Sequence, residues 1–346
     1  MKNNISIGLL LIIFLVALSS CEHAVETKTI VHTDGSLDKI IALESADSTL
    51  AEHNYLDIGK AQGWQIDIQR IDDNAKSKTV KKSQDKKFLY TFKKSFRSDA
   101  EANNDLAKPS DSLFRVTSKF ESRFRWFYTS MYYSDTYHAI NRFDLSTEDY
   151  LTKEDFQFID NLPAEGKPIS KADSLFLIGL NERIFDHYGN RAYFNDFYKI
   201  LTDLTKVTAQ REKLKTMREA IFQSMSKRKD IEEDFLPKLA DSLGVSIDFT
   251  STEYKKRKLS AENKLKFASW AAEGKYRHAI EMTNEIVSHN ADSVRENTFY
   301  WSPSYLKFLF RDYTFFVETR KPNIWAWVVS LIVLILAAFG LVRRGK

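Results

Sequence analysis

The chain has 346 residues, 51 Lys and Arg against 47 Asp and Glu, one cysteine and 43% hydrophobic residues. This composition excludes a disordered chain, an internal disulfide framework and a cysteine-based metal cluster. The net charge of +4 comes from Lys2, Arg343, Arg344 and Lys346, because removing these four leaves 47 basic and 47 acidic residues for positions 22–322. The basic excess therefore concerns the chain ends, and no nucleic-acid partner is expected.

Residues 1–20 have the pattern of a bacterial export signal. Lys2 precedes the apolar run Ile5–Leu18, whose 14 residues span about 21 Å as a helix, short of the roughly 30 Å hydrocarbon core. The run ends in Leu18-Ser19-Ser20-Cys21, which resembles a lipobox. The resemblance implies that Cys21 is lipid-modified, with acyl chains such as palmitate, and becomes the mature N-terminus. The alternative is an ordinary signal peptide with an unrelated cysteine.

Residues 21–145 are predicted to form the β-rich part of a sheet domain. Asp34-Gly35 is a hairpin turn signal between two β-rich runs. Four strands are predicted before residue 100, over Thr27–Val31, Leu37–Leu43, Trp64–Gln69 and Phe88–Phe92. Strict alternation of apolar and polar residues over Phe114–Tyr128 predicts one long strand with a buried face and a solvated face.

Residues 146–275 are predicted to form a helical insertion. Capping side chains with acidic residues in the first turn predict helix starts at Ser146, Thr152 and Ser170. Four further amphipathic segments follow, Phe194–Val207, Val207–Lys229, Ile231–Leu243 and Ala261–Ala272. Pro237 is expected to bend the third of these segments and Gly244 to end it.

Residues 276–322 are predicted to return to the sheet. Three extended segments are expected, Tyr276–Val287, Thr298–Trp301 and Tyr313–Glu318. The predicted fold class is therefore α+β, an antiparallel sheet domain formed by N- and C-terminal segments around a helical insertion. One C-terminal transmembrane helix completes it.

Residues 323–342 are predicted to form this transmembrane helix. Ile324–Val342 contains 19 residues without a charge, enough to cross the hydrocarbon core. Aromatic residues at one end and basic residues at the other mark the expected membrane interfaces, at Trp325, Trp327, Arg343 and Arg344.

Residues 343–346 are expected to form a short cytoplasmic tail. With an export signal in front and basic residues behind the helix, the body is expected on the periplasmic side. A helix this apolar indicates the bacterial inner membrane, because outer-membrane proteins span as barrels. Membrane lipid is the expected partner, together with a possible membrane protein complex.

Several motifs together resemble a known family. They are the lipobox, the Asp34-Gly35-Ser36 turn, Asn290-Ala291 followed by Trp301, and the C-terminal helix ending in basic residues. This combination resembles the LppM-type lipoprotein domain and, more closely, doubly anchored lipoproteins of Gram-negative bacteria. The resemblance implies an architecture and no reaction.

Motifs that carry chemistry are scarce. The eight glycines between residues 22 and 322 form no dinucleotide-binding, P-loop or nucleophile-elbow spacing, and the sequence contains no HExxH. No cofactor is expected. Glu182, Asp186 and His187 form the best local cluster, interpreted either as a metal or acid–base site or as a solvated helix face.

Two surface features have alternative interpretations. A basic stretch fits either anionic lipid headgroups or a solvated loop, with Lys76, Lys78, Lys81, Lys82, Lys86 and Lys87. An aromatic series fits either a ligand groove or core packing, with Trp126, Phe127, Tyr128, Tyr132, Tyr133 and Tyr137.

The expected function is that of a non-enzymatic envelope lipoprotein, a structural, scaffolding or accessory binding component at the inner membrane. An envelope hydrolase with paired carboxylates is one alternative, since acid pairs carry no sequence motif. A carrier for lipid or another apolar ligand is the other. Enzymatic activity is the less favoured interpretation.

Overall fold

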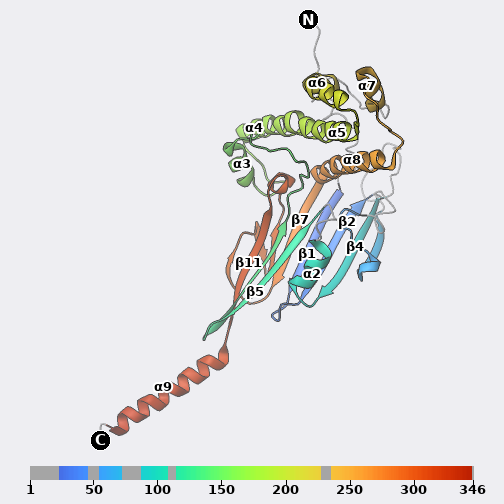
Figure 1. Cartoon of the computed structure of the whole chain (residues 1–346). Coiled ribbons are helices and arrows are strands. Elements are labelled where there is room, and N and C mark those ends of the chain that lie inside the picture. Colours follow the sequence, from blue (N-terminus) through green and yellow to red (C-terminus); the bar gives the residue numbers. More distant parts are fainter. Residues whose placement is uncertain (1–22, 46–53, 72–86, 108–113, 227–234, 345–346) are drawn as a thin grey trace, which may run out of the picture. The chain divides into compact units, whose positions relative to one another are not determined.

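The computed structural model describes residues 23–45, 54–71, 87–107, 114–226 and 235–344. These residues form two compact units (Figure 1). The sheet unit holds 23–138, 275–303 and the chain from Asp312, and the helical unit holds Ala139–Gly274 and Ser304–Arg311. The mixed α and β fold class predicted from the sequence is confirmed, but the sheet unit contains two sheets and not one.

The first sheet has seven strands in the order β3-β4-β2-β1-β7-β10-β9. The strands are β1 (His23–Val31), β2 (Leu37–Ser45), β3 (Gln65–Ile71), β4 (Lys87–Phe96), β7 (Gly274–Met282), β9 (Ser293–Arg295) and β10 (Thr298–Trp301), and the short helix η1 (Lys60–Gln62) precedes β3. The predicted hairpin turn joins β1 to β2, with Gly35 at φ +88°. Because β7 lies beside β1, segments from both ends of the chain share this sheet, as predicted.

The second sheet has four antiparallel strands in the order β5-β6-β11-β8. They are β5 (Val116–Phe124), β6 (Tyr128–Tyr137), β8 (Glu285–His289) and β11 (Tyr313–Pro322). The single long strand predicted over Phe114–Tyr128 is therefore wrong. The chain reverses at residues 125–127, where the Arg125 N–H donates to the Tyr128 carbonyl. Aromatic residues on both sides of this turn continue the alternation of apolar and polar residues. The sequence pattern therefore gives no sign that the strand ends there.

The strand predicted over Tyr276–Val287 is likewise divided. It separates into β7 and β8 at Thr283-Asn284, where Asn284 has φ +93°. This turn moves the chain from the first sheet to the second.

A helix that the sequence analysis missed, α2 (Asp99–Leu106), covers the open edge of β5. The Asn103 side-chain amide bonds both the N–H and the carbonyl of Ser118. Asp99 accepts the Phe120 N–H. An uncovered edge strand invites pairing with other chains, so these bonds protect the sheet.

The two sheets pack face to face through buried aromatic rings. Phe114 stacks on Tyr276 with ring centroids 6.0 Å apart, and Trp301 meets Phe315 at 5.5 Å. The Trp301 indole also donates to the backbone carbonyl of Asn290. Asn290 and Trp301, singled out in the sequence, therefore join β10 to the start of the turn that follows β8.

The helical unit contains α3 (Lys153–Asp160), α4 (Lys171–Glu182), the π-helical η2 (Arg183–Gly189), α5 (Asn190–Leu204), α6 (Thr208–Ser226), α7 (Phe235–Leu243), α8 (Thr252–Glu273) and η3 (Tyr305–Phe308). Thr152 forms a capping box with Asp155, and Ser170 caps α4, both as predicted. The core of the unit includes Phe194, Phe197, Leu214, Ile221, Leu236 and Tyr254.

Two helix predictions need correction. Ser146 begins a turn and not a helix. The bend predicted at Pro237 stays a prediction, because residues 231–234, which precede the described part of α7, lie outside the described residues. Helix α8 begins at Thr252, capped by Ser251, well before the predicted Ala261. Gly244 ends α7 at φ +62°, as predicted.

Helix α9 (Ile324–Arg344) follows β11 directly. Within the described residues it is the one helix long and apolar enough to cross a membrane. Only 6% of its apolar window is buried, which separates it from a core helix. One apolar helix of this kind fits membrane association.

Candidate functional site

Helix α9 begins against the tip of the β5–β6 hairpin. Asn323, the residue before the helix, donates its backbone N–H to the Phe127 carbonyl at 2.9 Å. Its side-chain amide donates to the carbonyls of Arg125, at 2.7 Å, and Trp126, at 3.3 Å. The Thr129 hydroxyl donates to the Asn323 side-chain oxygen at 3.1 Å. One asparagine therefore bonds three consecutive carbonyls of the turn and fixes the helix start to the four-stranded sheet.

Aromatic rings surround this junction. We call the group the aromatic collar, consisting of Phe124, Trp126, Phe127, Trp325 and Trp327. Phe124 and Trp126 both contact Trp325, with centroids 6.2 and 5.3 Å away, and Phe127 lies 4.4 Å from Trp327. The Trp126 indole donates to the Ser330 hydroxyl at 2.9 Å. All five rings remain exposed, between 39% and 59%.

The structure divides the aromatic series of the sequence between two environments. Trp126, Phe127 and Tyr128 lie exposed at the hairpin tip, whereas Tyr133 and Tyr137 are buried in the core. The six aromatic residues of the series do not line one common groove. Trp325 and Trp327, predicted as membrane-interface residues, lie in the first turn of α9, and Arg343 and Arg344 lie in its last turn.

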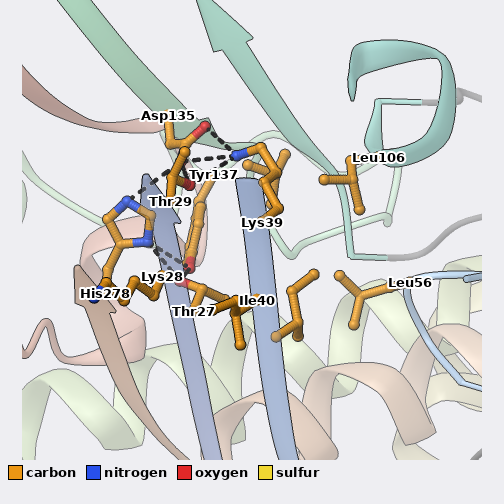
Figure 2. A pocket seen from close by; sticks show the side chains of 12 residues that line it. Thr27, Lys28, Thr29, Lys39, Ile40, Leu56, Leu106, Asp135, Tyr137 and His278 are labelled. Atoms are coloured by element: carbon orange, nitrogen blue, oxygen red, sulfur yellow. Dashed lines mark hydrogen bonds and ion pairs between the residues drawn. The ribbon is translucent and has the colours of Figure 1, made fainter. Parts of the chain in front are cut away.

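A second site lies between the two sheets. The Lys39 ammonium on β2 lies 2.8 and 3.0 Å from the two carboxylate oxygens of Asp135 on β6 (Figure 2). It also donates to the hydroxyls of Thr29 and Tyr133. We call this group, with Ser118, the buried ion-pair cluster. Because Lys39 and Asp135 are 3% and 0% exposed, their attraction is screened little by solvent.

His278 on β7 extends the cluster. Its Nδ1 shares a hydrogen bond with the Thr27 hydroxyl at 2.5 Å, and its Nε2 lies 3.5 Å from Asp135. The Tyr137 hydroxyl bonds the same threonine at 2.7 Å. The arrangement connects β1, β6 and β7 across the two sheets, and Figure 2 shows these side chains converging from both.

Burial and charge set the protonation of the cluster. Burial alone would raise the pKa of Asp135, but Lys39 and then His278 outweigh it and lower the pKa to about 2. Burial lowers the pKa of His278 to about 4. Burial, and then the Asp135 charge, raise the pKa of Tyr133 well above its usual range. At neutral pH the cluster therefore holds one cation and one anion, with a neutral histidine.

The Asp135 carboxylate is occupied by internal hydrogen bonds, whereas the buried Nε2 of His278 accepts and donates none among the described residues. Asp135 Oδ1 accepts from Lys39, Ser118 and Tyr133, and Oδ2 accepts from Lys39 and Thr29. A carboxylate with both oxygens occupied suits the joining of two sheets better than proton transfer to a substrate. The pocket beside it leaves about 20 Å³ of free space, far below the roughly 300–1,000 Å³ typical of small-molecule sites.

Sequence reasoning missed this cluster, although a signal was present. Lys39 occupies the same strand parity as Leu37, Ile41 and Leu43, which are all buried. Asp135 likewise lies two residues from buried Tyr133 and two from buried Tyr137. A charged residue at a core-facing position of a strand is unusual, and this parity predicts that Lys39 and Asp135 are both buried.

The cluster proposed from the sequence lies at the end of α4 and in η2. Burial, and then the Glu182 charge, raise the pKa of Asp186, while His187 is exposed. Among the described residues no group of three His, Cys, Asp or Glu side chains is placed to hold a metal ion. The predicted lipid site Cys21 and the lysines from Lys76 to Lys86 lie outside the described residues, as does the side chain of Lys87.

The low pKa of His278 predicts a loss of stability in acid. The folded value of about 4 lies below the unfolded 6.5, so the unfolded chain binds more protons as the pH falls between these values. The contribution of His278 to the free energy of unfolding should fall by about 3 kcal/mol between pH 6.5 and pH 4. At still lower pH, protonation of Asp135 should lower the free energy of unfolding further. Urea unfolding of the full-length chain in detergent, followed by tryptophan emission across this range, measures the change. His278→Gln should remove roughly half of the loss over this range, because burial also lowers the pKa of His23 to about 4 and that histidine remains. Substitution of exposed His32 by Gln should leave the profile unchanged, and equal profiles for the two variants would contradict the assignment.

No protein-family model matches the sequence, and no curated protein matches it. Among solved structures, the chain is similar to the folded domain of LppM from Mycobacterium tuberculosis, determined by NMR. The TM-score is 0.27 at 6% sequence identity, covering 87% of this chain and 91% of that chain. A TM-score this low does not establish a shared fold.

Proposed function

We propose that the protein is a non-enzymatic lipoprotein of the bacterial cell envelope, a scaffold or accessory binding component at the inner membrane. Its body lies on the periplasmic side, α9 spans the bilayer and Cys21 carries acyl chains. The observation that supports this proposal is the junction at Asn323, where the sheet unit is fixed to an apolar helix without a flexible linker.

The junction restricts how the sheet unit can turn on its anchor. Strand β11 ends at Pro322 and α9 begins at Ile324, so one residue separates them. That residue, Asn323, is held by three hydrogen bonds to the hairpin tip, and the aromatic collar packs around it. An enzyme acting on a diffusing substrate gains little from such a fixed orientation, whereas a component of a membrane complex depends on it.

The described chain begins at the end of the sheet unit that lies opposite the hairpin tip. The β1–β2 turn at Gly35 lies beside Phe120 on β5, toward the hairpin tip, so His23 at the start of β1 points the other way. Nine residues of strand span about 30 Å, and two residues from Cys21 to His23 add at most about 7 Å. Both anchors can enter one bilayer only if the sheet unit lies along the membrane surface. Held at both ends, it would present one fixed face to a partner.

Mild cross-linking of the full-length protein in cells, followed by purification in detergent, tests the proposal. We expect the same membrane proteins to copurify in repeated preparations. Cys21→Ser removes one anchor and leaves every described residue unchanged, so recovery of these proteins should fall while the chain stays in the membrane. Consistent recovery of both chains without any partner or bound lipid would contradict a scaffolding role.

A further inference from the structure

The tip of the β5–β6 hairpin lies beside the first turns of α9. The Trp126 indole donates to Ser330, which follows the first helical residue by six positions. Six residues of α-helix rise about 9 Å, so the tip overlaps the start of the apolar segment. If α9 spans a bilayer, as proposed above, the tip lies at the depth of the headgroups and the first acyl carbons.

The polar backbone groups at the hairpin tip are hydrogen-bonded within the protein, as a membrane environment requires. The carbonyls of Arg125, Trp126 and Phe127 all accept from Asn323, and the Arg125 N–H donates to Tyr128. An unsatisfied backbone group in a bilayer costs several kcal/mol, so irregular backbone enters lipid only where its polar groups are bonded. A turn facing water would lose little without these bonds.

The side chains of the tip match the same layer. Phe124 and Trp126 are 59% and 47% exposed, an unfavourable arrangement in water for rings gathered in one patch. Indoles favour the headgroup layer, where the ring meets acyl chains and the N–H meets polar groups. Arg125 and Lys321 are exposed beside the rings, and long basic side chains extend toward lipid phosphates.

We propose that the β5–β6 hairpin tip inserts into the membrane interface together with the start of α9, with phospholipid as its ligand. The inference rests on the membrane-spanning role proposed for α9. The four-stranded sheet then contacts the membrane through its hairpin tip, in addition to the contact made by α9. Insertion of the tip would set the depth of the sheet unit and oppose its rotation about the helix axis.

Quenching of tryptophan emission by lipids brominated near the headgroup end of their acyl chains tests the inference. The full-length chain is reconstituted in phosphatidylethanolamine and phosphatidylglycerol vesicles with and without brominated lipid. Trp126→Phe should remove roughly one third of the quenched emission, because three indoles share the interface. The matched control Trp64→Phe removes a core indole that is bonded to Asp105, and should leave the quenched emission unchanged.

A gain-of-signal pair makes the test independent of any effect of Trp126→Phe on folding. Phe124→Trp adds an indole at the tip and should add quenched emission. Phe88→Trp adds one at the end of β4 that pairs with Ser45, away from the tip, and should add emission that brominated lipid does not quench. Quenching of the parent chain with no response to Trp126→Phe and Phe124→Trp would overturn the hairpin inference alone. Absence of quenching in the parent would overturn the spanning role of α9.

Discussion

Replacing Asp135 by Asn is expected to lower the free energy of unfolding by about 3–5 kcal/mol, because the change leaves the Lys39 ammonium buried without a counter-charge. Lys39 lies 2.8 Å from Asp135, and both side chains are almost completely buried. The substitution keeps the size and shape of the residue, so the loss reports on charge and not on packing. Denaturant unfolding of the full-length chain in detergent at pH 7 measures it.

Two comparisons separate this effect from a general cost of losing a carboxylate. Glu281→Gln removes a partly exposed pair with Lys28 and should cost less than about 1 kcal/mol. The double change Lys39→Met with Asp135→Leu removes both charges, and should recover much of the loss because no charge remains buried alone. Equal losses for Asp135→Asn and Glu281→Gln would show that the buried ion-pair cluster does not hold the two sheets together.

Removal of the two proposed anchors is expected to have the second large effect. A chain ending at Asn323 keeps Cys21 and should stay in the membrane fraction through its acyl chains. Cys21→Ser keeps α9 and should also stay, since a spanning helix holds a protein almost irreversibly. The chain with both changes, in which residues 1–20 are also replaced by an export signal that is cleaved without lipidation, should move from almost wholly membrane-bound to almost wholly soluble. Cell fractionation after a high-salt wash, followed by immunoblotting, measures the distribution.

A deletion of residues 345–346 provides the control, since it leaves the described part of α9 complete and should not alter the fractionation. Solubility of the chain ending at Asn323 would show that Cys21 carries no anchor. Retention of the doubly altered chain in the membrane would show that α9 and the acyl chains are not the anchors that hold the protein there.

Sequence patterns of a few residues correctly predict those turns, helix starts and strands that depend only on neighbouring residues. The Asp34-Gly35 turn, the caps at Thr152 and Ser170 and the strand Thr298–Trp301 all appear as the sequence predicts. Each depends on turn geometry, capping bonds or alternation within a few residues. At these positions the tertiary contacts do not override the local conformational preferences of the residues.

The remaining features depend on neighbours that the sequence does not bring together. Alternation continues through the turn at residues 125–127 because Trp126 packs on Trp325, nearly two hundred positions away. The short helix α2 is held by bonds to Ser118 and Phe120, outside any local pattern. Lys39 and Asp135 could be predicted to be buried from strand parity, but their pairing depends on how two sheets meet. The membrane-interface role of Trp325 and Trp327 stays a prediction.

The orientation of the chain in the membrane tests the central proposal most directly. Lys60→Cys places a thiol at an exposed position of the sheet unit, and Lys346→Cys places one in the predicted tail. Spheroplasts carrying either chain are treated with a membrane-impermeant maleimide, with the parent chain as the blank for Cys21. We predict labelling of the Lys60→Cys chain on intact spheroplasts and of the Lys346→Cys chain only after detergent is added. Labelling of the Lys346→Cys chain on intact spheroplasts, with the Lys60→Cys chain protected, would contradict a periplasmic scaffold held by α9.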